Sequence, residues 1–346
     1  MTRSSSDPAR VSAVVVVHET TAPRLERCLA ALRASEGVEV EIIVVDNKSP
    51  HPVHAPLADR VLERATNGGF AAGVNDGIRA ASAPWIAVVN DDAVVQPDAL
   101  RLCVEALTAA PRKVLAAAPK VLFADSTDLD SCGIVVRPTG EAFSAGAGQP
   151  DLGQFDRDRT VLGPCFSTAV FRASAFAAVG LLDERYFLYY EDVDWALRCF
   201  LSGHDCVFVP AAVVHHEHAA STRSLGEQRR FRLVQRNLLL CATANLSWPS
   251  VARVWAGRLL AATKSVAKGP DRTSLVAAIG AALVRLPGVL VARRSRRAVA
   301  TRHDHAAFAF AEGLQPFVDT ATYRPSQPQA ALAAARARLT RHDPHG

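Results

Sequence analysis

The sequence predicts an α/β protein with a mostly parallel sheet, helices on both faces of that sheet, and a basic helical extension at its C-terminal end. The sheet is indicated by three runs rich in apolar, β-branched residues, at Val11–Val17, Glu41–Val45 and Trp85–Val89. Continuous runs of this kind are typical of parallel strands that helices cover on both sides. Each run ends abruptly on polar residues, and such sheets bind ligands at the carboxyl ends of their strands.

Segments with helical periodicity separate these runs. In Pro23–Ser35, leucines recur at helical spacing behind a proline near the start, which predicts a helix and therefore a strand–helix–strand unit. The glycine-rich segment Asn67–Gly77 opens a short helix that runs to about Ala81, and Pro84 ends it. Pro97–Ala110 is the next predicted helix.

The second half of the chain is less regular, and it contains no internal repeat. Residues 120–148 predict irregular hairpins and loop. Beyond them the sequence predicts a strand over Val161–Phe171, helices over Ala173–Val179 and Glu191–Ser202, and a short strand over Cys206–Val209.

Charge divides this chain of 346 residues into two parts near residue 223. Residues 1–222 carry 19 Lys and Arg against 28 Asp and Glu, whereas residues 223–346 carry 20 against 6. The acidic part suits a metal, and the basic part suits phosphates, anionic lipid or nucleic acid. Nucleic acid is the poorer match, because no RNA or DNA motif occurs and few aromatic residues are interleaved with the arginines.

Cysteine usage and the N-terminal segment favour a cytoplasmic protein. The seven cysteines include no CxxC pair, which is typical of a reducing compartment. The first ten residues are polar and lack the apolar core of a secretion signal. The stretch Thr273–Ala292 is apolar apart from Arg285, and an arginine near the centre of a span costs roughly 2.5–3.5 kcal/mol on insertion. We therefore expect either an in-plane amphipathic helix with a basic flank or a packed core helix.

Three polar residues, Asn90, Asp91 and Asp92, follow the third apolar run with no Lys or Arg close by in the sequence. Mg²⁺ and Mn²⁺ prefer oxygen ligands of this kind and bridge them to substrate phosphates. Such a string is more often a solvated turn when it stands alone. Its place after a buried strand favours a metal site.

A second acidic group, Glu191, Asp192 and Asp194, follows a run of aromatic residues and opens a predicted helix. Capping is the plain alternative, because the helix dipole favours an acid there by ~0.3–1 kcal/mol. Capping needs one acid rather than three, and aromatic neighbours raise the basicity of a carboxylate by desolvation. The cluster suits proton abstraction from a hydroxyl.

Histidines gather at His215, His216 and His218, around Glu217. On an extended segment His216 and His218 share one face, a spacing that suits a metal. A closed zinc site would need further ligands, so we favour one histidine joining the carboxylates on a shared cation.

In this order, the motifs resemble those of the family 2 glycosyltransferases, most closely the bacterial rhamnosyltransferase-like branch. The resemblance spans about residues 11–236 and rests on VDN, the glycine-rich helix, NDD, the stretch Gly163–Arg172, LDERYFLYYEDVDWALR and a histidine before a Ser-rich turn. Its specificity lies in the order and spacing of these motifs. It implies a GT-A fold, with a Rossmann-like half that binds a nucleotide sugar and a half that binds the acceptor.

The resemblance also implies donor contacts. Asp46 would bond to the base, and His18 and Glu19 would flank the base and ribose; the latter pair replaces an Asn-Tyr-type pair in many relatives. The remaining donor-binding residues would be Asn67, Gly69, Asn75, Asn90 and Asp91.

Metal binding and catalysis follow from the same resemblance. Asp92, Asp91 and His216 would hold Mg²⁺ or Mn²⁺, with His215 or His218 as alternatives to His216. Asp91 stands where many relatives have proline, which leaves metal binding intact. Asp192 would be the catalytic base and Glu191 its neighbour.

The implied reaction is a single-step inverting displacement. L-rhamnose from dTDP-rhamnose would move to a hydroxyl of a lipid-linked or cell-envelope glycan. The alternatives are transfer of another sugar such as galactofuranose and a non-catalytic nucleotide-sugar-binding protein. A metallohydrolase lacks support because no HExxH occurs, and a processive synthase would normally show membrane spans and a QxxRW-like element.

The expected domain organisation has four parts: a disordered N-terminus at 1–10, the GT-A transferase domain at 11–222, a basic helical region associated with the membrane or acceptor at 223–310, and a low-complexity tail at 311–346. The protein would be peripheral on the inner face of the plasma membrane. The arginines expected to meet anionic headgroups or an acceptor diphosphate, each worth about 1 kcal/mol near the surface, are Arg229, Arg230, Arg232, Arg236 and those between 293 and 297.

Overall fold

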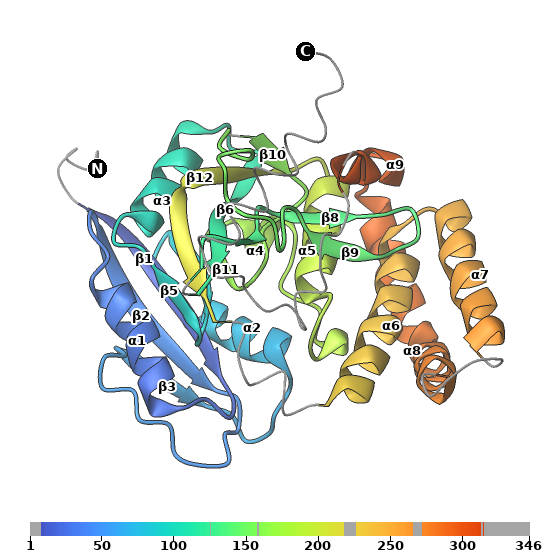
Figure 1. The fold of residues 1–346 in the computed structure, drawn as a ribbon, viewed down its shortest axis with the longest axis horizontal. Helices are drawn as coiled ribbons and strands as arrows, with labels where there is room; N and C mark the ends of the chain where they lie inside the picture. The colour runs from blue at the N-terminus through green and yellow to red at the C-terminus, as the bar shows by residue number, and fades with distance from the viewer. Residues whose placement is uncertain are drawn as a thin grey trace.

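The computed structural model describes residues 8–124, 126–157, 159–217, 226–265, 272–312 and 314. Within these ranges a ten-stranded sheet forms the centre of the molecule, and the C-terminal helices pack at one side of it (Figure 1). Its strand order is β10-β12-β6-β11-β4-β1-β2-β3, with β5 beside β12 and β7 beside β6. Helices and a mostly parallel, mixed sheet confirm the predicted fold class.

The N-terminal half of the sheet is parallel. β1 (Ala9–Val17) lies between β2 (Val38–Asp46) and β4 (Trp85–Asn90). β3 (Arg60–Glu63), which the sequence analysis did not predict, extends the sheet beyond β2. The connecting helices are α1 (Ala22–Arg33) and α2 (Phe70–Ala80). The three apolar runs are therefore the strands β1, β2 and β4, although β1 begins within the segment predicted to be disordered.

Both faces of these strands are buried. Val14 and Val16 pack in one apolar core, and Val11 and Val15 pack in another. α2 and α5 (Glu191–Leu201) contribute to the first core, while α1 and α3 (Ala99–Ala109) contribute to the second. Because helices cover both faces, the strands are apolar throughout instead of alternating with polar residues.

The second half of the sheet is partly antiparallel. β11 (Thr168–Arg172) runs antiparallel between β4 and β6 (Val114–Phe123). The single strand predicted over Val161–Phe171 is wrong, because β10 (Arg159–Val161) ends where a loop begins. Pro164 in that loop cannot donate a ladder hydrogen bond, and Gly163 lies so close to Ala196 that a side chain would not fit.

β12 (Asp205–His216) is much longer than the predicted strand over Cys206–Val209. Pro210 interrupts the apolar pattern, and the pairing with β6 shifts register between Val209 and Val213 before it resumes. β6 itself reaches into the segment predicted to be irregular. The short strands beside this pair are β5 (Ala93–Val95) and β7 (Leu129–Ser131).

The C-terminal region is helical, as predicted. Its helices are α6 (Glu227–Asn245), α7 (Trp248–Ser265), α8 (Arg272–Ala298) and α9 (Asp304–Phe308). A further apolar core joins α5, α6 and α8 through residues such as Leu197, Leu239 and Ala282. The smaller elements are α4 (Ala175–Ala178), the hairpin of β8 (Ile134–Val136) and β9 (Ala142–Ser144), and the 3₁₀ turns η1 (Glu184–Tyr186) and η2 (Ala309–Ala311).

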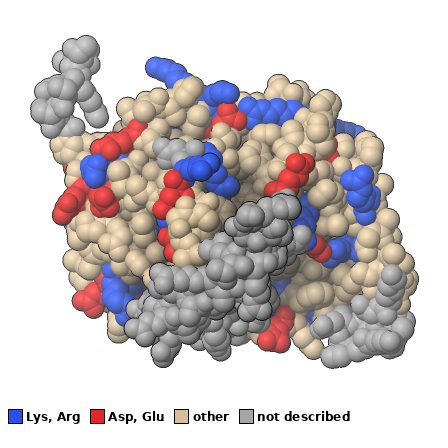
Figure 2. All heavy atoms as spheres, turned by 45° about the horizontal axis from the view of Figure 1, so that its top comes forward, with Lys and Arg blue, Asp and Glu red and all other residues tan. Residues whose placement is uncertain are grey.

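Some of the basic residues expected at a membrane surface lie inside the protein instead. Arg293 is buried and donates to the carbonyls of Thr243 and Leu246, the former at 2.7 Å. Arg236 is also buried. The expectation that these two arginines meet headgroups is therefore wrong. On the face shown in Figure 2, red and blue side chains lie close together at the left, and separate red and blue groups are spread over the rest.

Candidate active site

Polar residues at the ends of β1, β2, β4 and β12 lie near one edge of the sheet. β1, β2 and β4 are parallel neighbours, so His18, Asp46 and Asn90 share that edge. β12 reaches it by another route, because its final residue His216 pairs with Ala93 of β5. The amide of Glu217 also donates to the carbonyl of Asp92, at 3.0 Å. This pairing brings the histidine beside the Asn90-Asp91-Asp92 string.

His216 lies between two carboxylates. Its Nε2 is 3.1 Å from Oδ1 of Asp92, and its Nδ1 is 2.8 Å from Oδ2 of Asp130. Burial alone would lower the pKa of His216, but Asp92 and Asp130 raise it well above the usual value. A carboxylate on one ring nitrogen is the usual way to orient a metal-binding histidine with its other nitrogen toward the cation.

The residues present fit a divalent-cation site in which a bound substrate supplies the remaining ligands of the cation. Asp91 is buried, and its Oδ2 has no hydrogen-bond partner among the described residues. Burial and the neighbouring Asp92 raise the pKa of Asp91 to about 6, and a cation would relieve that repulsion. No group of three His, Cys, Asp or Glu side chains forms a metal cage in the described ranges. Mg²⁺ characteristically takes one or two carboxylates together with substrate phosphates.

On the donor side, Asn47 ties the end of β2 to the glycine-rich turn. Its Nδ2 donates to Asn67 Oδ1 and to the carbonyl of Gly69, both at 3.0 Å. Its Oδ1 accepts from the amide of Gly68 at 3.2 Å. Asp46 beside it accepts from the amide of Ser49 at 2.7 Å and forms a tight turn. The structure thus brings Asp46, Asn67 and Gly69 into one neighbourhood.

His18 and Glu19 follow β1 at the same edge. Their side chains are 3.8 Å apart, and Glu19 has a φ of 58°, a left-handed conformation that is uncommon for a residue with a side chain. The Nδ1 atom of His18 is buried without a hydrogen-bond partner in the described part of the chain. A buried polar atom without a partner is typical of a site that a ligand completes.

Asn75 was predicted to bind the donor, but its side chain is fully engaged inside the protein. Its Nδ2 donates to the carbonyl of Leu182 and to Glu184, both at 2.9 Å, and its Oδ1 accepts from the amide of Leu182. We therefore assign Asn75 a structural role. It links α2 to the segment that leads into the second acidic group.

That segment, the aromatic loop of Tyr186–Tyr190, has an unusual backbone. Phe187, Tyr189 and Tyr190 all have φ between 66° and 72°. The carbonyl of Phe187 accepts from the amide of Phe70 at 2.7 Å, and a side chain at Gly69 would overlap this carbonyl. A glycine is therefore required at position 69, which also has a φ of 84°.

α6 holds the other side of the aromatic loop. Nδ2 of Asn237 donates to the carbonyls of Tyr186, Leu188 and Tyr189 at 3.0, 2.8 and 2.7 Å. Arg236 adds a hydrogen bond to the carbonyl of Tyr186 at 2.7 Å. Backbone conformations of this kind cost about 1–3 kcal/mol each and persist where the surroundings fix them. The donor-side turn and α6 together fix this loop.

The three acids that begin α5 have different surroundings. Asp194 is fully buried and accepts from Tyr186, Arg198, Asn245 and Arg296 at 2.7–2.9 Å. Burial would raise its pKa, but the two arginines lower it to about 2. Asp194 is thus a permanently charged structural residue.

Glu191 and Asp192 have no cationic partner among the described residues. Burial raises the pKa of Glu191 to about 8, with a further rise from Asp192, and its Oε2 has no hydrogen-bond partner in the described chain. Asp192 is partly exposed and accepts from the amide of Val193 at 2.7 Å. Burial also raises its pKa, to about 6. Asp192 is therefore the more accessible carboxylate of the pair.

Comparison with known proteins identifies a family domain. The model of glycosyl transferase family 2 matches residues 12–180, from β1 to just beyond α4. These residues form a family 2 glycosyltransferase domain. The chain carries both acidic groups of its predicted site, although the second group lies beyond the matched residues.

A relative supports the branch. This glycosyltransferase is 28% identical over 252 residues to N-acetylglucosaminyl-diphospho-decaprenol L-rhamnosyltransferase of Mycobacterium tuberculosis, an alignment of 60% of this chain and 76% of the relative. It is 35% identical over 106 residues to the succinoglycan biosynthesis protein ExoO of Rhizobium meliloti, over 29% of this chain and 30% of that protein.

A solved structure supports the fold. The crystal structure of GalNAc-T7 with UDP, GalNAc and Mn²⁺ has a TM-score of 0.53 and 12% identity, over 69% of this chain and 48% of that one. This likeness concerns the GT-A fold alone.

Four structural residues were not among the predicted site residues: Asn47, Asp130, Asn237 and Arg296. Asn237 directly precedes the apolar run of α6 that begins at Leu238, and Asp130 is an acid in a buried strand, so burial of a polar group was the available signal. Arg296 carried no such signal, because it stands among three similar arginines. His218 lies outside the described residues, and the side chain of His215 is not among those that meet Asp92 in the described part of the chain.

Proposed function

We propose that this glycosyltransferase is an inverting enzyme that transfers L-rhamnose from dTDP-rhamnose to a hydroxyl of a glycan carried on a lipid diphosphate. The observation that carries the inverting mechanism is the pairing of one accessible carboxylate, Asp192, with a buried neighbour, Glu191. The sugar and acceptor are supported by the name of the mycobacterial relative. The same residues would serve transfer of galactofuranose, so the donor must be tested.

Donor binding would use the edge of the sheet. Asp46 would bond to the base, and His18 and Glu19 would flank the base and ribose. Asn67 and the Gly69 turn would line the nucleotide sugar, held in place by Asn47. Asn90 would bind near the diphosphate of the nucleotide sugar.

Asp92 and His216, with Asp91 beside them, would hold Mg²⁺ or Mn²⁺. The bound cation would supply positive charge that stabilises the leaving nucleoside diphosphate. Asp130 would keep the imidazole of His216 turned toward that position, because it accepts from Nδ1.

Asp192 would accept the proton of the acceptor hydroxyl as that oxygen attacks the anomeric carbon. A base with a pKa near 6 remains mostly ionised at neutral pH yet is more basic than an ordinary aspartate. Glu191 would stay protonated beside it. A non-catalytic binding protein would have no use for this accessible carboxylate.

The same proposal assigns the transferase domain to residues 11–222 and an acceptor- or membrane-associated part to 223–310. A lipid-linked acceptor would place the protein on the inner face of the plasma membrane. This division describes roles, because the two parts are in contact. Asn237 of α6 bonds to the aromatic loop, and Arg296 of α8 bonds to Asp194 of α5.

Release of nucleoside diphosphate by the purified protein tests this function. The donors are dTDP-rhamnose, UDP-galactofuranose, UDP-glucose and GDP-mannose, with polyprenyl-diphosphate-GlcNAc as acceptor, each with and without EDTA. We expect release from dTDP-rhamnose that needs both acceptor and metal. Release from a different donor would replace rhamnose as the transferred sugar. A donor that binds but is not cleaved with any acceptor and metal combination would favour a binding protein.

The metal site has its own test. Asp92→Ala should weaken donor binding by about tenfold or more in Mn²⁺, because a charge that holds the cation is lost. Asp92→Ala and the wild type should bind the donor equally in EDTA, as calorimetry would measure. A wild-type affinity that EDTA leaves unchanged would remove the cation from the mechanism.

A further inference from the structure

α8 has apolar residues on two opposite sides. One side packs against α6 and buries Leu275, Ala278, Ile279, Ala282 and Val289. The other side exposes large apolar side chains, with Val284 79% and Val291 68% exposed. A surface helix of a soluble domain ordinarily carries polar residues on its outer side. The expectation of a packed helix and that of an amphipathic surface helix thus each describe one side of α8.

The exposed residues form one stripe along the helix. Val276, Leu283, Val284 and Val291 recur at spacings of seven or eight residues, close to two helical turns, and Gly280 lies between them, where an added Cβ would meet no described residue within 4 Å. At 1.5 Å per residue the stripe is about 22 Å long. At the carboxyl end of α7, Leu259 and Leu260 are also half exposed. An exposed apolar surface of this length marks an interaction site.

The charges near the stripe are positive. Arg285 is exposed on the flank of α8, about half a turn around the helix from Val276, and its guanidinium donates to the carbonyl of Ala281 in its own helix. Arg294 is exposed beyond the stripe, and Arg253 is exposed on α7. None of these three arginines has a carboxylate partner among the described residues. Arginines with long apolar stems readily extend from an apolar layer to a charged one.

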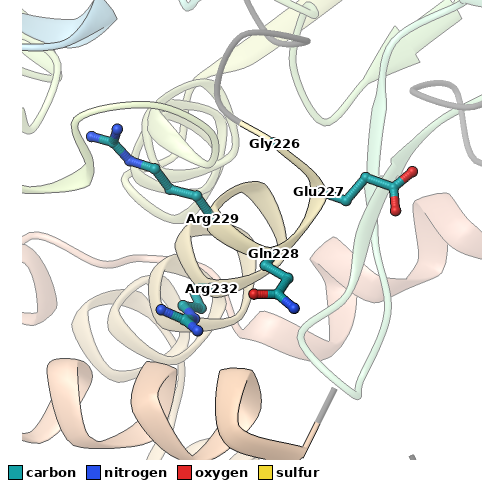
Figure 3. Close-up of a pocket in the computed structure, with 5 residues that line it drawn as sticks. All are labelled: Gly226, Glu227, Gln228, Arg229 and Arg232. Carbon is teal, nitrogen blue, oxygen red and sulfur yellow. The ribbon is translucent and has the colours of Figure 1, made fainter. Parts of the chain in front are cut away.

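A second positive group borders α8 at the start of α6. Arg229 and Arg232 line a hollow there and lie on one side of the helix, with Glu227 on the other side (Figure 3). Nε of Arg232 donates to Oγ of Ser274 at 3.2 Å, which attaches this hollow to the first turn of α8.

We propose that this α8 face, defined by Val276, Leu283, Val284, Val291 and Arg294, docks on an anionic bilayer with α8 parallel to the membrane plane. The apolar stripe would enter the boundary between headgroups and acyl chains, as in-plane helices do to a depth of about 5–10 Å. The arginines around it would meet lipid phosphates. This inference rests on the proposed membrane location and not on the identity of the sugar.

Charge decides between a bilayer and a second copy of the chain. A symmetric dimer through the α8 face would place this surface against itself. The arginines of α8 would then approach the same positive surface of the other copy, and α8 contains no acid to offset the repulsion. An anionic bilayer offers both the apolar layer and the negative charge that the face lacks.

The test is co-flotation of the full-length protein with vesicles of phosphatidylcholine and phosphatidylglycerol, compared with vesicles of phosphatidylcholine alone. Val284→Glu and Val291→Glu are combined in one variant, since both side chains are exposed and the changes should not disturb packing. Val61→Glu, on the exposed edge strand β3, is the matched control. Transfer to a short-chain, water-soluble acceptor is measured for all proteins.

We expect the partition coefficient of the double variant for anionic vesicles to fall by at least about tenfold. Burying one valine side chain alone raises such a coefficient by about that factor. The control and the wild type should partition equally and prefer the anionic vesicles. Transfer to the soluble acceptor should be unchanged in every protein. An absence of transfer in the wild type would refute the proposed function while leaving the docking result interpretable.

Two results would overturn the docking proposal. One is a double variant that floats with anionic vesicles as the wild type does. The other is a wild type that does not float but forms a dimer, by light scattering, that the double variant abolishes; the face would then belong to a second copy of the chain.

Discussion

Asp192 and Asp194 lie two residues apart on one helix, yet their surroundings give them opposite properties. Asp194 meets Arg198 and Arg296, and its pKa falls to about 2. Asp192 has no such partner among the described residues, and burial raises its pKa to about 6. The sequence Glu-Asp-Val-Asp does not distinguish these residues. The difference arises from two arginines, Arg296, which α8 brings across the molecule, and Arg198, which lies four residues after Asp194 on α5.

This comparison shows how the helical region contributes to the site. Arg296 neutralises one acid of α5, and Asn237 of α6 fixes the aromatic loop that precedes it. The remaining acids stay without a cation in the described part of the chain, so their protons can be exchanged with a substrate. A cluster of three carboxylates thus contains one structural anion and one candidate base.

The largest expected effect comes from removing the base. Asp192→Asn should lower the transfer rate by about 10²–10⁴-fold, because the amide cannot accept the hydroxyl proton. Donor affinity should remain within about twofold, since Asp192 makes no proposed donor contact. Transfer assays and donor calorimetry on the same preparation measure both. Weakened donor binding at full turnover would reverse the assignment.

Removing the structural acid should act on folding instead. Asp194→Ala removes the fully buried carboxylate that Arg198 and Arg296 share, although Arg296 keeps its pair with Asp183, and should cost about 3–5 kcal/mol in the free energy of unfolding. Urea denaturation at neutral pH measures this cost. Glu105→Ala is the matched control, because it breaks an exposed pair with Arg101 at the same four-residue spacing, which is worth about 0.3–0.5 kcal/mol. Equal losses in the two variants would contradict a structural role for Asp194.

The pH dependence of stability follows from the same shift. The folded pKa of Asp194 is lowered, so its stabilising contribution is complete above the ordinary aspartate value of about 3.9 and is lost as the pH falls toward 2. The difference in unfolding free energy between the wild type and Asp194→Ala should therefore shrink over this acidic range. A difference that is constant down to the acid limit of folding would argue against the lowered pKa.

A smaller effect is expected at the aromatic loop. Asn237→Ala removes the donor for three carbonyls and should cost about 1–3 kcal/mol in stability. It should also lower kcat, since the loop positions Asp192. Gln235→Ala, which alters a side chain on the same helix that bonds to Arg258, should leave kcat unchanged. If Asn237→Ala lost stability but kept its kcat at temperatures where it is folded, the loop would have no positioning role.

The sequence predicted the parts of the fold that depend on local pattern. Val11–Val17, the Glu41–Val45 run and Trp85–Val89 are buried on both faces, so their composition alone indicated parallel strands. The polar residues at their ends were found for the same reason. The glycine-rich turn was also found from local sequence, but the requirement for glycine at position 69 comes from its contact with Phe187, which lies far away in the sequence.

Other parts depend on contacts between distant residues. The antiparallel direction of β11 and the full length of β12 are decided by pairing with β4 and β6, and Pro210 hid the second half of β12. Asn75 has the residue type of a donor-binding group, but its partners at Leu182 and Glu184 lie more than a hundred positions away. Arg296 could not be distinguished from its neighbours until α8 was placed against α5.

The pH profile of kcat for the wild type and Glu191→Gln, at saturating donor and metal, tests most directly the claim that Asp192 is the base. Asp192 must be ionised to accept a proton, so kcat should fall as the pH drops through about 6. The acidic limb should persist in Glu191→Gln with its midpoint nearly unchanged, because Glu191 is already protonated over the pH range in which Asp192 titrates. A limb that disappears in Glu191→Gln would make Glu191 the base and contradict the account.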